Sequence, residues 1–288
     1  MEKEWSLMNF HSIWYIALVA ASLLLLLYTY YQKKNHPVLY LLIAAIGFGY
    51  IIEGIIYNLL HSYEYYPHLL PNNPTYDSNL GAIASNVFVL PVVAVFIATF
   101  QKSKRWILFL SLLIIGIEWS FLKLGIYKHN WWRIEFTFFG LITVYFPMIK
   151  LLNRWLQDKQ SGVRHYILLF LIISPILGTL HILPIMFFTI RSYHLGWYEN
   201  VYQDTNAFAA IYYICSGLFI TTLVRLKWII SWAKCLILII VLYSISRLFI
   251  SIGILKISVW WDPYYYSIFP VFVFMFSRGI SRKIGEVQ

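Results

Sequence analysis

Charged residues are scarce in this sequence. They make up 12% of the 288 positions, whereas apolar residues make up 60%. A soluble domain of this length carries about twice as much charge. The apolar residues recur in long runs along the whole chain, and an α-helix satisfies its own backbone hydrogen bonds in lipid. We therefore expect an all-α, polytopic integral membrane protein, in which a soluble domain has no room.

Cysteine and the familiar chemical signatures are also nearly absent. The two cysteines, Cys215 and Cys235, lie in apolar runs and form neither a CxxC spacing nor a disulfide framework. The sequence contains no GxxxxGK[ST], HExxH or GxSxG motif. Four histidines of the predicted outer loops have acidic neighbours but no metal-ligand spacing, namely His61, His68, His129 and His194. We expect no cofactor and no metal site.

The net charge of +10 has a topological explanation. Most Lys and Arg residues stand in short clusters between apolar runs, and they favour one set of alternating connections. Cytoplasmic loops carry such an excess of positive charge, so nucleic acid is not an expected partner. The bias predicts a multi-pass cell-membrane protein with its N-terminus outside and its C-terminus in the cytoplasm. The acidic start, MEKEWSLMNFHS, and the long first run indicate a span that is not cleaved.

Nine apolar runs approach the roughly 20 residues that a membrane-spanning helix needs. An odd number of spans agrees with termini on opposite sides of the membrane. The predicted spans are Ser12–Tyr31, Val38–Leu60, Gly81–Phe100, Trp106–Leu124, Phe136–Leu152, His165–Ile190, Ala207–Val224, Trp228–Leu255 and Tyr264–Ser277.

Three features of the first half of the chain return about 127 to 130 residues later. They are the span ends His61-Ser62-Tyr63 and Arg191-Ser192-Tyr193, the acids Asp77 and Asp204, and the aromatic pairs Trp131-Trp132 and Trp260-Trp261. We expect the four Trp residues in an aromatic belt at the outer interface. Each segment matches one that lies four spans later, which predicts a parallel repeat. The prediction is a leading helix over residues 1–36 and two four-helix repeats over residues 37–160 and 161–288.

Four ionisable side chains interrupt the apolar spans, namely Glu53, Glu118, His181 and Arg247. A charge in lipid costs roughly 3 kcal/mol or more, so such residues face the protein interior or water and usually have a partner. In the predicted repeat, Glu53 falls near His181 and Glu118 falls near Arg247, at similar depth in the outer half of the membrane. Two interpretations fit: ion pairs that fix the two halves together, and a polar cavity, open to the outside, that handles protons.

The stretch from Ile117 to Pro147 resembles a family of uncharacterised multi-helix membrane proteins from spore-forming Gram-positive bacteria, and the resemblance covers roughly the first half of the chain. The matching residues are Glu118, Trp119, Leu122, Lys123, Gly125, Trp132, Tyr145 and Pro147. This resemblance implies a membrane-helix fold and no assigned activity. The second half departs from it, with Arg247 in place of the carboxylate. The segment GIYKHNWW is also similar to small bacterial lycopene cyclases, but their paired glutamates are absent there, so that activity is not carried over.

Three classes of function fit these features. A transporter or flippase for a small or lipid-like substrate is favoured, because charges at a repeat interface are common in transporters and no motif marks a bond to be broken. The alternatives are a lipid-modifying enzyme at the outer face, with Glu53 or Glu118 as general acid or base, and a non-catalytic sensor or assembly component. Two carboxylates in one pocket would favour the enzyme. The expected partners are the lipid bilayer and a lipid or small-molecule substrate.

Overall fold

The chain folds as an all-α helical bundle. The computed structural model describes residues 2–34, 37–70, 72–226 and 230–285. Within these ranges the chain divides into two compact units, unit 1 (Met1–Asp158) and unit 2 (Lys159–Gln288). The predicted start of the eighth span at Trp228 and the end of the leading segment at residue 36 lie outside the described residues.

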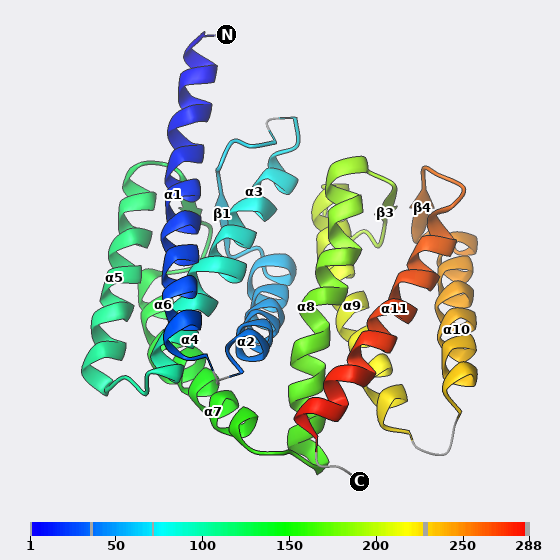
Figure 1. Cartoon of the computed structure of the whole chain (residues 1–288). Helices are drawn as coiled ribbons and strands as arrows, with labels where there is room; N and C mark the ends of the chain where they lie inside the picture. Colours follow the sequence, from blue (N-terminus) through cyan, green and yellow to red (C-terminus); the bar gives the residue numbers. More distant parts are fainter. Residues whose placement is uncertain (1, 35–36, 71, 227–229, 286–288) are drawn as a thin grey trace. The chain divides into compact units, whose positions relative to one another are not determined.

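Unit 1 contains five helical segments and one pair of short strands (Figure 1). Three of the segments change from α-helical to π-helical geometry and two of these change back, without a break in the chain. In order, the elements are α1 (Glu2–Gln32), α2 (Val38–Glu53) with η1 (Gly54–Leu59), β1 (Tyr63–Tyr65), α3 (Pro74–Ile83) with η2 (Ala84–Val89) and α4 (Leu90–Thr99), α5 (Lys104–Lys123), β2 (Tyr127–His129), and α6 (Ile134–Gly140) with η3 (Leu141–Tyr145) and α7 (Phe146–Gln157).

Unit 2 contains four helices and a second pair of strands. All four helices keep α-helical geometry over their described lengths. The elements are α8 (Gly162–Phe188), β3 (Arg191–Tyr193), α9 (Val201–Arg225), α10 (Ser231–Ser251), β4 (Leu255–Ile257) and α11 (Asp262–Ile284).

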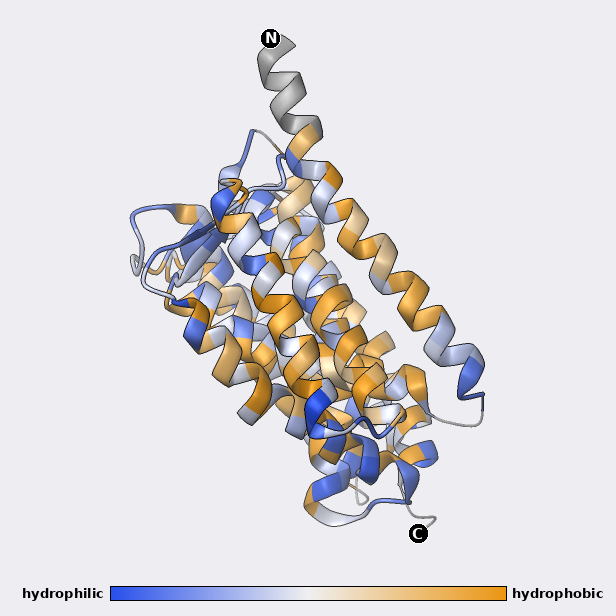
Figure 2. Ribbon diagram, turned by 90° about the vertical axis from the view of Figure 1, so that its left-hand side faces the viewer, coloured by the Kyte–Doolittle hydropathy of each residue, from blue (hydrophilic) through white to orange (hydrophobic). Residues whose placement is uncertain are grey.

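The helices have the length and composition of membrane spans. Eight of those in the described ranges are long and apolar enough to cross a bilayer, from Phe10–Gln32 to Ser231–Ser251. Figure 2 shows apolar residues along the helices and hydrophilic residues mainly in the loops at their ends. The ninth helix, α11, has 23 residues and coincides with the predicted span Tyr264–Ser277, but its last turns carry Arg282 and Lys283. The predicted class, a polytopic helical membrane bundle of about nine spans, is confirmed.

Each unit holds one antiparallel strand pair between its helix ends. In unit 1, Tyr63 pairs with His129 and Tyr65 with Tyr127. In unit 2, Arg191 pairs with Ile257 and Tyr193 with Leu255. Every position in the second pair lies 128 residues after its equivalent in the first. The chain enters β2 through Gly125 and β4 through Gly253, both with positive φ, a conformation that glycine adopts without steric cost.

A buried aspartate organises the loop after the first strand of each unit. The Asp77 carboxylate accepts hydrogen bonds from the backbone N–H groups of His68, Leu69 and Leu70. The Asp204 carboxylate accepts them from Leu195, Gly196 and Trp197, each 127 residues later. One hydroxyl group after each aspartate, on Ser78 or Thr205, accepts a bond from the middle of the loop's strand. We call the strand pair and the aspartate-bound loop the frame of each unit.

The frame corrects two of the predicted correspondences. The segment Arg191–Tyr193 had been matched to His61–Tyr63, but the strand register places Arg191 opposite the position of Tyr63. The same spacing of 128 residues matches Glu53 with His181, as predicted from the sequence. It matches Glu118 with Ser246, not with Arg247. Sequence similarity alone misplaced these positions because the charged side chains differ, whereas strand pairing depends only on the backbone.

Candidate functional site

Unit 1 encloses a cavity of about 400 Å³. Its lining residues run from Tyr15 in α1 to Tyr145 in η3, so each of the helices before α7 contributes to the wall, as do both strands. Both predicted carboxylates, Glu53 and Glu118, belong to this lining. Most of the other lining residues are aliphatic or aromatic. This volume and composition are typical of a site for a small organic molecule.

The three π-helical segments of the described chain all contribute to the cavity wall. Glu53 immediately precedes η1, Asn86 lies within η2, and Tyr145 ends η3, and all three residues line the cavity. A π-helical turn carries an extra residue and interrupts the regular hydrogen-bond ladder, and such turns occur frequently at functional sites. Their convergence on one cavity marks it as the candidate site of the molecule.

Glu53 is buried at the cavity with one oxygen bound and the other free. The side chain is 8% exposed. Its Oε2 accepts a hydrogen bond of 2.6 Å from the hydroxyl group of Tyr63. Its Oε1 accepts no hydrogen bond from the described residues. Asn86 lies beside the carboxyl group, but its amide donates to the carbonyl oxygen of Ala82 at 3.1 Å. A buried polar atom without a partner is rare and requires an explanation, such as a ligand.

Glu118 belongs to a hydrogen-bonded chain on another wall of the cavity. Its Oε1 accepts a bond of 3.1 Å from the Thr137 hydroxyl group and lies 2.8 Å from Nε2 of His129. The Thr137 oxygen in turn accepts a bond of 2.8 Å from the Trp132 indole. The His129 side chain is 16% exposed, compared with 9% for Glu118. Burial lowers the pKa of His129, and nearby Glu135 opposes this shift. Glu118 therefore has a partner that titrates and that reaches the surface of unit 1.

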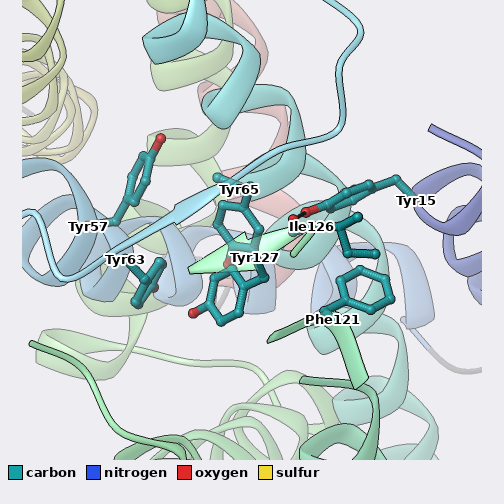
Figure 3. Close-up of a cluster of buried hydrophobic side chains, with 9 residues drawn as sticks. Tyr15, Tyr57, Tyr63, Tyr65, Phe121, Ile126 and Tyr127 are labelled. Atoms are coloured by element: carbon teal, nitrogen blue, oxygen red, sulfur yellow. Dashed lines mark hydrogen bonds between the residues drawn. The ribbon is translucent and has the colours of Figure 1, made fainter. Parts of the chain in front are cut away.

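Tyrosine rings from the two strands cover one end of the cavity (Figure 3). Side chains alternate along a strand, so Tyr63 and Tyr65 point inward while Glu64 between them points outward. The ring of Tyr127 lies 4.8 Å from that of Tyr65 and 5.5 Å from that of Tyr63. Burial raises the pKa of all three tyrosines well above the ordinary value, so their hydroxyl groups keep their protons. The tyrosines were predicted to belong to an interfacial belt; for these three that prediction is wrong.

In unit 2 the equivalent region is filled. His181 is 2% exposed and packs against the rings of Tyr193, Tyr212 and Tyr266 at 6.1, 5.0 and 4.9 Å. Its Nε2 lies 3.3 Å from the Tyr193 hydroxyl group. This cluster has no room for the proton-handling cavity that the sequence suggested around His181.

The buried charges of unit 2 are Arg191 and Asp262, which the sequence placed in outer loops. Nε of Arg191 donates to Oδ2 of Asp262 at 2.9 Å, and Nη2 donates to Oδ1 at 2.6 Å. Both side chains are 0% exposed, and the guanidinium carbon lies 3.2 Å from the centre of the Tyr266 ring. Arg247, by contrast, is exposed on α10, so its description as a buried charge is wrong. The sequence signal that could have identified Arg191 is its position, 128 residues after Tyr63 and on the inward side of the strand.

The remaining predicted site residues divide between the surface and the cavity. Trp131, Trp260 and Trp261 are exposed at 47%, 80% and 39%, as expected for an aromatic belt. Trp132 instead lines the cavity. The bonds that the structure gives Glu53, Glu118 and His181 all lie within their own units, and the predicted pairs Glu53–His181 and Glu118–Arg247 stay predictions.

The described side chains include no group of three or more His, Cys, Asp or Glu residues that could hold a metal ion. What the cavity offers is two carboxyl groups, one with a free oxygen and one linked to a histidine, on apolar and aromatic walls. Such a set can bind an apolar molecule and exchange a proton with it. No family model, no curated protein and no solved structure matches the chain.

Proposed function

We propose that the protein is a membrane-embedded enzyme that carries out acid–base chemistry on a lipid-like substrate in the cavity of unit 1. The observation that carries this proposal is the presence of both Glu53 and Glu118 in the lining of one cavity. General acid–base catalysis needs a proton donor or acceptor within hydrogen-bond reach of the reacting group. A reaction that both gives and takes a proton needs two such groups.

The free Oε1 of Glu53 is the group that would exchange a proton with the substrate. Tyr63 holds the other oxygen and so fixes the orientation of the carboxyl group. Glu118 is the second acid–base group, and His129 would exchange its proton with water at the surface of unit 1. Positioning of this kind keeps a catalytic group close to its productive geometry.

This proposal replaces the transport function that the sequence favoured. That function placed the cavity between two repeats, whereas all lining residues of the cavity found here belong to unit 1. A non-catalytic role was expected to show fully paired charges and no cavity. Glu53 Oε1 lacks a partner among the described residues, and the cavity is present.

The test is lipid conversion by the full-length protein in liposomes made from a total membrane lipid extract, followed by mass spectrometry. We expect one lipid species to fall and another to rise with the wild-type protein. Glu53→Gln and Glu118→Gln should each slow this conversion by about 100-fold or more, the contribution of a positioned acid or base. Glu64→Gln is the matched control, because Glu64 lies on the outward side of β1. Unchanged lipids with the wild-type protein, or full conversion by Glu53→Gln, would exclude the enzyme.

His181 distinguishes this site from the one predicted from the sequence. Because His181 is packed within unit 2, His181→Gln should lower the melting temperature in detergent and leave lipid conversion per folded molecule unchanged. Loss of conversion in a folded His181→Gln protein would restore the predicted Glu53–His181 pair.

We also propose that the two units arose by internal duplication and that the protein lies in the cell membrane with its N-terminus outside. The constant spacing of the frame supports the duplication. The distribution of Lys and Arg supports the orientation. In a variant with both native cysteines replaced by serine, a cysteine at exposed Glu199 should react with an impermeant reagent from outside, and one at exposed Lys104 should not. The reverse pattern would overturn the orientation. The resemblance to the spore-former family stays a prediction; its Glu118, Trp132 and Tyr145 all line the cavity.

A further inference from the structure

The cavity of unit 1 has a one-sided charge. Its lining contains two carboxyl groups, Glu53 and Glu118, and none of its described lining residues is Lys, Arg or His. The closest basic partner, His129, contacts Glu118 but is not part of the lining. An anionic ligand would have to leave water and lie beside two carboxyl groups without a compensating cation, which is costly in an apolar site.

The aromatic residues of the cavity offer ring faces more than hydrogen-bond donors. The hydroxyl group of Tyr15 donates to the carbonyl oxygen of Ile126 at 2.6 Å, and that of Tyr145 donates to Ala45 at 3.1 Å. The hydroxyl group of Tyr63 donates to Glu53. With these donors engaged, the rings present their π faces and edges to the space. The face of an aromatic ring attracts a cation and does not attract an anion.

We infer that the cavity selects an apolar molecule that carries a positive charge, such as a hydrophobic amine or quaternary ammonium or phosphonium ion, and rejects anionic lipids. A cation would take up the free Oε1 of Glu53, which is more than nine-tenths buried, and would separate the like charges of the two carboxylates. This inference rests on the proposed function for its site, and it specifies the substrate class.

The test uses two probes of nearly equal size and shape but opposite charge, tetraphenylphosphonium and tetraphenylborate. Binding to the full-length protein in detergent is measured by titration calorimetry at neutral pH. The double variant Glu53→Gln/Glu118→Gln in the same detergent gives the background from nonspecific partition. Above that background, we expect tetraphenylphosphonium to bind at least about tenfold more tightly than tetraphenylborate. Each single variant should weaken its binding by about tenfold, and Glu64→Gln should not change it.

A second measurement removes the dependence on variants that fold poorly. Acidification that protonates the carboxyl groups should weaken binding of the phosphonium to the wild-type protein and should not weaken that of the borate. Equal or tighter binding of the borate, or phosphonium binding that neither the double variant nor acid reduces, would overturn the inference. The two proposals fail separately. Charge-selective binding without lipid conversion would remove the enzyme and keep the ligand class, whereas conversion of an anionic lipid would do the reverse.

Discussion

In unit 1 the pair Glu53 and Tyr63 lies beside a cavity, whereas in unit 2 the residues at the same spacing, His181 and Arg191, lie in a filled core. The strand pairs and aspartate-bound loops around them use the same bonds at the same spacing. One frame thus surrounds an acidic cavity in one unit and a buried ion pair in the other. The difference comes from a few inward-facing side chains, not from the backbone of the frame.

The volume of those side chains explains why one interior is hollow. At Gly81, an added Cβ would lie 2.3 Å from Cβ of Tyr65, so α3 packs directly against the strand. The residue 127 positions later is Phe208, whose ring lies 4.7 Å from that of Tyr193. In unit 2, Arg191 also requires a buried partner, which Asp262 supplies from the start of α11. The π-helical segments of unit 1 widen its helices around the space that remains.

The strongest test of the comparison is the ion pair of unit 2. Arg191→Gln and Asp262→Asn should each destabilise the protein by about 3–5 kcal/mol, because each leaves a buried charge without its partner. The double variant should recover part of this loss, as expected for residues in contact. Chemical denaturation in detergent measures the free energy of unfolding. Arg247→Gln is the matched control and should have little effect, because Arg247 is exposed. A strictly additive double variant would contradict the pairing.

The shared frame predicts equal losses in the two units. Asp77→Ala and Asp204→Ala should each cost about 2–3 kcal/mol, because each removes a carboxylate that accepts three backbone hydrogen bonds. The melting temperature of each variant in detergent, compared with the wild-type protein, gives the two losses. A large loss in only one unit would mean that the frame is conserved in geometry but not in its contribution to stability.

A smaller effect should come from the tight approach of α3 to β1. Gly81→Ala should destabilise unit 1 by about 1–3 kcal/mol, since the new methyl group would overlap Tyr65 and push its ring toward the cavity. The same experiment can follow binding of tetraphenylphosphonium, which should weaken as the cavity narrows. Gly116→Ala, where an added Cβ meets no atom within 4 Å, is the control. Unchanged stability of Gly81→Ala would show that the strand can move away freely.

The smallest expected effect is a pH dependence confined to unit 1. Burial lowers the pKa of folded His129 below that of the unfolded chain, so the unfolded state binds more protons in mild acid. The contribution of this histidine to stability is therefore complete above its unfolded pKa and is lost as the pH falls. Glu118 and Glu135 face the ring and reduce the effect. The equivalent residue in unit 2, Ile257, does not titrate.

Melting temperatures of the wild-type protein and of His129→Gln, measured from about pH 8 to 5, test this prediction. The wild-type protein should lose more stability on acidification than the variant. An identical slope in the two proteins, or a wild-type protein that becomes more stable in acid, would contradict it.

Much of the candidate site could be read from the sequence, but its assembly could not. Glu53 and Glu118 stand out because each interrupts an apolar run, and both line the cavity. Tyr63 and Tyr127 did not stand out, because a tyrosine beside a span is equally typical of the membrane interface. Arg247 was chosen over Arg191 for the same reason: a charge within a helical run is visible in sequence, whereas a charge in a three-residue strand resembles a loop.

The sequence by itself determined the class of the protein, the number and limits of its helices, and the spacing between its halves. These follow from local quantities: the length of apolar runs, the position of glycine and aspartate at helix ends, and the scarcity of charge. Only the tertiary structure decided that Glu53 and Glu118 share a cavity while Arg191 and Asp262 share a bond. Those contacts depend on which side chains fill the space between helices, and that is a property of three-dimensional packing, not of any single segment.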